Sequence, residues 1–167
     1  MNPEINPFPT ADPHRHALWD MLVQRDIDAF LAADWSMVDG DFRHEGFVGL
    51  HAHHQENPDR WRLAFPTVEA YRDEWLRQAH EAREISYAEP LRAAIFRTTS
   101  LADIDINGAV AVLHKKFDGT IRRSDGGADR LLWQTLYFCA HDGARWKITG
   151  FVGYMPYAGA SGGIPRA

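Results

Sequence analysis

The sequence predicts an α+β domain in which a curved antiparallel sheet packs on about three N-terminal helices. The last third of the chain holds two pairs of β-rich segments, and each pair is joined by a dipeptide that favours a tight turn, Asn107-Gly108 or Asp142-Gly143. A type I′ turn needs positive φ at both central residues, which these dipeptides tolerate. The first half instead spaces its apolar residues by three and four, which is typical of helices.

The helices come first in the predicted order. Residues 1–11 hold three prolines and are expected to form a flexible arm. Asp12 then suits the N-cap of a first helix, because Pro13 is favoured at the first helical position. Asp26 is a second N-cap candidate, so we expect two consecutive helices, the second of which ends at Gly40.

A short strand and a third helix should follow. We expect a strand over 42–52, an exposed polar loop over 53–61, and a helix that begins at Thr67. Pro90 forbids continuation of that helix, and residues 93–106 read as one long extended strand.

One domain should therefore span 12–157. Residues 122–129 are the loop between the two hairpins, and 158–167 are expected to form a flexible tail. A chain of 167 residues fits one domain. A domain of this size buries about 70% of the surface of its unfolded chain, so its core needs no disulfide or metal.

Composition narrows the classes of partner. The formal net charge of −5 argues against non-specific nucleic-acid binding and against an anionic membrane surface. The sequence shows no secretory signal and no apolar run of membrane-spanning length, so we expect no membrane partner and a cytoplasmic protein. Its one cysteine, Cys139, allows no internal disulfide.

The turn at Asp142-Gly143 implies a register for the second hairpin. It pairs Tyr137 with Ile148 and Thr135 with Gly150. The face that carries them mixes aromatic bulk with hydroxyl groups and reads as the wall of a pocket, in which the glycine leaves space.

The opposite face of that hairpin is apolar through Leu136, Phe138 and Phe151. If the helices cover one side of the sheet, this outer face needs another cover. We therefore expect a homodimer that forms through the outer face of the sheet.

Four segments, in this order, resemble the nuclear transport factor 2-like superfamily, whose members include polyketide cyclases of the SnoaL type, ketosteroid isomerase and scytalone dehydratase. They are 25–35 (RDIDAFLAADW), 65–76 (FPTVEAYRDEWL), 103–117 (DIDINGAVAVLHKKF) and 145–156 (RWKITGFVGYMP). The resemblance implies a cone-shaped, cystatin-like α+β fold around a cavity. It does not imply one activity, because this fold hosts enzymes, binders and scaffolds.

Two departures from that family prevent the transfer of catalytic residues. Cyclases and isomerases of this group place a carboxylate or histidine on the strands that line the cone, and the closing strand here, TGFVGYMP, has neither. The isomerase pattern of an early tyrosine is also absent, because the first tyrosine is Tyr71.

The candidate site residues therefore come from the sequence itself. Asp41 or His44, just after the second helix, could act as a general base, and Tyr71 or Tyr137 as a hydrogen-bond donor; the alternative for the first two is a polar turn that ends the helix. The expected ligand pocket is lined by Trp35, Trp75, Trp133, Thr135, Trp146 and Ile148.

Two other clusters have competing interpretations. His51 and His53 would share a strand face and could bind a metal with His44 or Asp41 as a third ligand, or they could be solvated loop residues. Asp103 and His114 would be diagonal neighbours on the first hairpin, as an acid–base pair or as a simple ionic contact.

These observations lead to one functional hypothesis and its rivals. We expect a pocket for a small apolar or aromatic ligand, in an enzyme of the dehydratase, isomerase or cyclase kind that transfers protons without a cofactor or a metal. The alternative is a non-catalytic ligand-binding or dimeric interaction domain. A metal enzyme that uses His51 and His53 is the third hypothesis.

Overall fold

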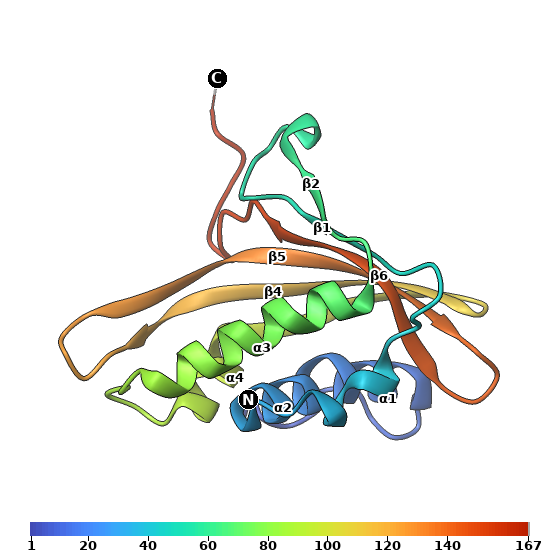
Figure 1. Ribbon diagram of the computed structural model, residues 1–167, viewed down its shortest axis with the longest axis horizontal. Helices are drawn as coiled ribbons and strands as arrows, with labels where there is room; N and C mark the ends of the chain where they lie inside the picture. The colour runs from blue at the N-terminus through green and yellow to red at the C-terminus, as the bar shows by residue number, and fades with distance from the viewer. Residues whose placement is uncertain (167) are drawn as a thin grey trace.

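The computed structural model describes residues 1–166. Its helices lie on one face of a six-stranded sheet that curves over them (Figure 1). The strands are ordered β2-β1-β6-β5-β4-β3, and β1 and β6 are parallel while the other neighbours are antiparallel. The predicted α+β class is confirmed.

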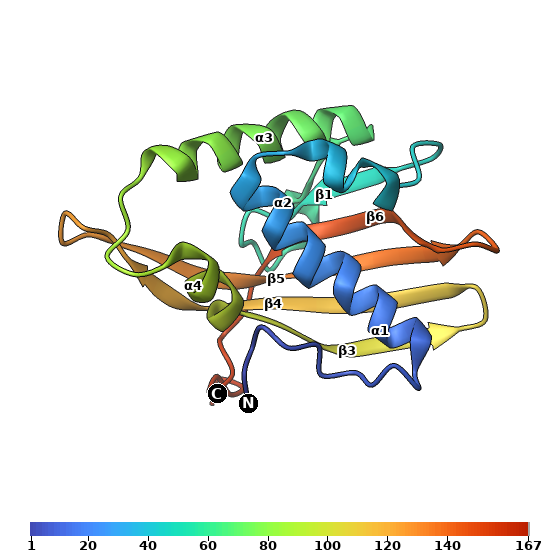
Figure 2. The same cartoon turned by 90° about the horizontal axis from the view of Figure 1, so that it is seen from below.

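The first helical run crosses the face of the sheet diagonally (Figure 2). It consists of α1 (Pro13–Trp19), a π-helical turn (Asp20–Arg25) and α2 (Asp26–Ala32). Asp12 caps it as predicted, because its carboxylate accepts the N–H of Arg15 at 3.2 Å. The turn between the two helices is wider than an α-helix, a feature often found at functional sites.

The second helix ends earlier than predicted. Ala33, with φ of 50°, takes the left-handed conformation and stops α2 well before Gly40. Two 3₁₀ turns, Trp35–Met37 and Asp39–Asp41, follow instead. The carboxylate of Asp34 accepts the N–H of Ser36 at 3.0 Å and so caps the first turn rather than extending the helix.

Two short strands form the edge of the sheet. β1 (Val48–His51) is shorter than the predicted strand over 42–52, because most of that segment crosses to the sheet as a loop. β2 (Arg62–Phe65) was not predicted; it pairs with β1 across the polar segment 53–61.

Two further helices flank the first run. α3 (Val68–Glu84) begins as predicted, with the hydroxyl of Thr67 accepting the N–H of Ala70 at 3.1 Å. The expectation of a strand from residue 93 is wrong, because 91–98 form α4 (Leu91–Thr98). Leu, Arg and Ala favour helix, and the fully buried Phe96 packs on Trp19.

The four long strands are β3 (Thr99–Asn107), β4 (Val110–Arg122), β5 (Ala128–His141) and β6 (Trp146–Met155). Both predicted hairpins are present, but the register of the second is displaced. Asp142 accepts the N–H groups of Ala144 and Arg145 at 2.8 Å, which widens the loop so that His141 pairs with Trp146.

Irregularities in β6 then reverse part of the predicted face assignment. Register shifts place Phe151 opposite Tyr137, and Gly150 opposite Phe138. Phe151 therefore lies on the concave face rather than on the outer face, and Gly150 leaves no space beside Thr135. A bulge of this kind turns successive side chains to the other side of a strand.

Candidate functional site

A cavity of about 210 Å³ lies between the concave face of the sheet and helices α2, α3 and α4. All of these elements contribute side chains, and the sheet does so through β2, β4, β5 and β6. The lining consists of Asp26, Ile27, Phe30, Phe65, Tyr71, Glu74, Trp75, Gln78, Ile95, Lys115, Phe117, Leu131, Trp133, Thr135, Tyr137, Phe151, Gly153 and Tyr154.

An ion pair forms the charged part of the wall. The ammonium nitrogen of Lys115 donates to Oδ2 of Asp26 at 2.8 Å. The lysine side chain is 2% exposed and that of the aspartate 32%, so only the carboxylate is substantially open. Lys115 reaches this place because Ala111, Leu113, Lys115 and Phe117 alternate on the inner face of β4.

Neighbouring groups hold both partners in place. Nε1 of Trp75 donates to Oδ1 of Asp26 at 3.3 Å, and the carbonyl of Leu22 accepts from Nζ of Lys115 at 2.5 Å. Leu22 belongs to the π-helical turn and Asp26 opens α2 directly after it. The irregular turn thus presents a carbonyl and a carboxylate to one ammonium group.

Three hydroxyl groups complete the polar lining. Those of Tyr71, Thr135 and Tyr137 form no hydrogen bond with any of residues 1–166, although every fully enclosed polar side-chain atom in that range has a partner. These hydroxyls therefore open onto the cavity. Burial raises the pKa of both tyrosines well above the usual value, which keeps them protonated as donors.

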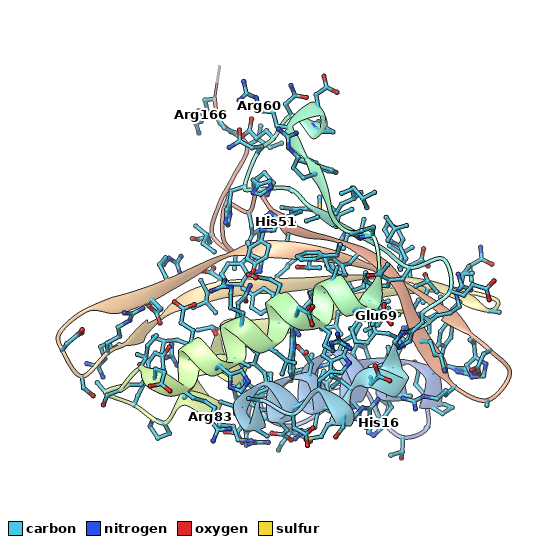
Figure 3. All side chains as sticks on the ribbon, viewed as in Figure 1. His16, His51, Arg60, Glu69, Arg83 and Arg166 are labelled. Atoms are coloured by element: carbon cyan, nitrogen blue, oxygen red, sulfur yellow. The ribbon has the colours of Figure 1, made fainter. Side chains whose placement is uncertain are left out.

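One end of the cavity carries a second polar group of residues. The hydroxyl of Tyr154 bonds to the amide of Gln78, at 3.2 Å to its nitrogen. Hydrogen bonds from Arg77 lower the pKa of Glu74 to about 2. The ring of His51 stacks on Tyr154 with centroids 4.3 Å apart, and its burial lowers the pKa of His51 to about 4. Figure 3 shows His51 on the sheet near the projecting β1–β2 segment.

The structure separates the sequence-predicted base candidates from this cavity. Asp41 is 2% exposed, lies outside the lining and is held by Arg25 and Arg145. His44 is on the surface, where its ring bonds to Glu69 at 3.0 Å. Figure 3 places Glu69 near the start of α3.

Of the predicted pocket residues, Trp75, Trp133 and Thr135 line the cavity, as do Tyr71 and Tyr137. The other three lie elsewhere. Trp35 stacks on Phe42 at 5.1 Å, Trp146 donates to Nδ1 of His14 at 3.1 Å, and Ile148 borders a separate void of about 10 Å³.

The other two predicted clusters form only in part. The rings of His51 and His53 stack at 3.9 Å, but no group of three or more His, Cys, Asp or Glu side chains within residues 1–166 is placed to hold a metal ion. Asp103 and His114 are direct cross-strand partners, and Asp103 forms an ion pair with Lys116 at 2.8 Å. That contact fits the ionic alternative.

The sequence reasoning missed Asp26 as a site residue and Lys115 altogether. Two signals could have found them. Asp26 lies four residues from both Leu22 and Phe30, on an otherwise apolar helix face. Lys115 continues the inward alternation of Ala111 and Leu113, where a charge is unexpected.

Similarity to known proteins is confined to structure. No protein-family model and no curated protein matches the sequence. An NTF2-like protein of unknown function from Shewanella baltica OS155 has a TM-score of 0.51 at 12% identity, over 88% of this chain and 95% of that one. Another from Pseudomonas putida KT2440 has a TM-score of 0.52 at 14% identity, over 86% of each chain. The chain has the nuclear transport factor 2-like fold.

A third structure extends this likeness. A conserved protein from Planctomyces limnophilus DSM 3776 has a TM-score of 0.55 at 15% identity, over 88% of this chain and 97% of that one. The nuclear transport factor 2-like fold thus spans almost the whole of both chains. Within residues 1–166, no helix has the length and apolar character needed to cross a membrane.

Proposed function

We propose that the cavity binds a small apolar or aromatic molecule and that the protein transfers protons on it, as an enzyme of the dehydratase, isomerase or cyclase kind that needs no cofactor. Asp26 takes the role of base, in place of Asp41 or His44. One observation carries the proposal: a partly open carboxylate faces two unpartnered tyrosine hydroxyls across an aromatic cavity.

The size of the cavity limits the ligand. An apolar cavity of about 150 Å³ can hold benzene. A cavity of about 210 Å³ with mostly aromatic walls is therefore suited to a single ring that carries a small substituent.

The polar groups suggest how such a ligand reacts. A carbonyl oxygen accepts from the hydroxyls of Tyr71 and Tyr137, while Asp26 removes a proton from the adjacent carbon. The tyrosines stabilise the enolate that develops, because a fixed donor in an apolar site acts strongly on a new negative charge. Lys115 keeps the carboxylate in place and ionised before the transfer.

Hydrogen exchange tests this chemistry without knowledge of the natural substrate. In D₂O the protein should catalyse exchange of the α-protons of phenylacetone, followed by proton NMR. Asp26→Asn should reduce the rate by about a hundredfold or more, because it removes the base and preserves the side-chain shape. His44→Gln is the matched control and should leave the rate unchanged.

Two results would reject the enzyme hypothesis. Exchange at the rate of free buffer, with phenylacetone bound, would favour the non-catalytic binding alternative. An equal loss of rate in His44→Gln would remove Asp26 from the proposed role.

We also propose that two copies associate through the outer face of the sheet. Val112 and Phe138 are cross-strand partners on that face, and they are 39% and 40% exposed. Val110 at the end of the same strand is 56% exposed. Large apolar side chains gathered in this way are typical of a subunit contact.

A further inference from the structure

Lys115 is unusual among the basic residues of this chain. Of the 18 basic residues only three are lysines, namely Lys115, Lys116 and Lys147, and the others are arginines. Lys115 alone of the three lies in the cavity wall, with 2% exposure. An arginine would hold Asp26 equally well as a charge, but its guanidinium does not lose a proton and cannot act as an amine nucleophile.

The contacts of Lys115 leave one direction free. Its ammonium group has three N–H donors, and two of them bind Asp26 and the carbonyl of Leu22. The third has no hydrogen-bond partner among residues 1–166. Nζ lies 5.4 Å from the centre of the Phe117 ring, which is itself part of the cavity wall.

The surroundings supply the other groups that an amine nucleophile needs. Asp26, at 2.8 Å, can take a proton from the ammonium and so free its lone pair. Thr135 is the direct cross-strand partner of Lys115, and Tyr137 is the next inward residue on the same strand. Their unpartnered hydroxyls can bind the oxygen of a carbonyl group beside the amine.

We propose that Lys115 forms a Schiff base with small aryl aldehydes or ketones in this cavity; this inference rests on the ligand cavity of the proposed function but not on catalysis by Asp26. Nζ gives one proton to Asp26 and adds to the carbonyl carbon, forming a C–N bond. The carbonyl oxygen then leaves as water with two of the three original ammonium protons. The third remains on the iminium nitrogen, whose positive charge replaces that of the ammonium beside Asp26.

The walls favour an aryl group on that carbonyl. The rings of Phe117 and Trp133 stack with centroids 4.6 Å apart, and Trp133 lies 5.2 Å from Tyr154. A single aromatic ring can pack on these faces while its carbonyl carbon reaches the amine. Closed, apolar surroundings also limit the water that would hydrolyse the imine.

Reductive trapping with benzaldehyde tests the proposal. Cyanoborohydride reduces an iminium to a stable benzylamine, and peptide mass mapping then assigns the modified lysine in the wild-type protein. We expect Lys115 to be modified about tenfold faster than Lys116 or Lys147, because the cavity holds the aldehyde next to it. If Lys115 is only a structural ion pair, its burial makes it the slowest of the three, and that order would overturn the proposal.

Two controls separate this proposal from the proposed function. Benzyl alcohol fills the same space but cannot form an imine, so an excess should suppress modification of Lys115 and leave Lys116 unaffected. If benzyl alcohol quenches the fluorescence of the cavity tryptophans and phenylacetone still exchanges, but no adduct forms at Lys115, the Schiff base is rejected while the proton-transfer function stands. The double variant Lys116→Arg, Lys147→Arg keeps the cavity intact and should still take up one benzyl group.

Discussion

Asp41 shows how a single carboxylate can be important for the fold while lying outside the cavity. Its oxygens accept from Nε and a terminal nitrogen of Arg25 at 2.8 and 2.7 Å, and from Arg145 in the β5–β6 loop. It thereby joins the first helical run to the far end of the sheet. The same contact raises the pKa of Arg25. This residue was predicted as a catalytic base, and the structure gives it a bridging position.

Asp41→Asn should therefore lower the free energy of unfolding and leave the cavity intact. We expect a loss of about 2–3 kcal/mol, somewhat below the 3–5 kcal/mol typical of a broken buried ion pair, because both arginines remain partly hydrated. Urea denaturation followed by tryptophan fluorescence measures the change. Asp73→Asn, which breaks an exposed pair with Arg72, should cost less than about 0.5 kcal/mol.

The cavity residues differ in how far the sequence could predict them. Tyr71, Trp75 and Tyr137 follow from local periodicity, because helix and strand patterns identify inward positions. The pairing of Asp26 with Lys115 does not, since the two residues are 89 positions apart and meet only when the sheet closes on α2. A charge on an apolar face was the one local sign of it.

At the scale of elements, local chemistry was predictable and exact register was not. Asn107-Gly108 and Asp142-Gly143 identified both hairpins. The pairing inside the second hairpin depended on hydrogen bonds from the side chain of Asp142 and on shifts along β6, which the turn dipeptide does not encode. α4 was missed because Phe96 and its neighbours carry β-forming side chains in a segment whose burial against Trp19 favours helix.

Gly150 gives an element-level prediction. A Cβ at this position would lie 2.5 Å from the carbonyl oxygen of Val48, in the parallel pair of β1 and β6. Gly150→Ala should separate the two strands and destabilise the protein by about 1–3 kcal/mol, as overpacking does. Thermal unfolding measures the change.

The matched control is Gly40→Ala, whose Cβ would meet only the side chain of Arg145, at 3.5 Å. Its melting temperature should stay close to that of the wild type. Equal melting temperatures for Gly150→Ala and the wild type would show that β1 can move away from β6 at no cost.

At the scale of the whole molecule, the outer sheet face sets the expected assembly. Val112→Glu should weaken the proposed dimer at least about a hundredfold, because an unpaired carboxylate buried in an interface costs about 3 kcal/mol or more. Sedimentation velocity over a range of protein concentrations measures the association. Leu63→Glu adds the same charge to edge strand β2, away from Val112, and should leave the dimer unchanged.

A wild-type protein that sediments as a monomer at every concentration would contradict this prediction. So would equal dissociation by both glutamate substitutions, since a general effect of added charge would then explain the result.

The wide turn over 20–25 makes the reacting centre sensitive to the number of residues in the chain. Loss of a single residue there would let the run wind as an unbroken α-helix and would rotate everything after it by about 100°. The carboxylate of Asp26 would swing away from the amine of Lys115 while the rest of the sheet stayed as it is. Relatives that keep the same overall shape but carry one residue fewer in this stretch would thus have to obtain their charge pair, and their chemistry, from other positions.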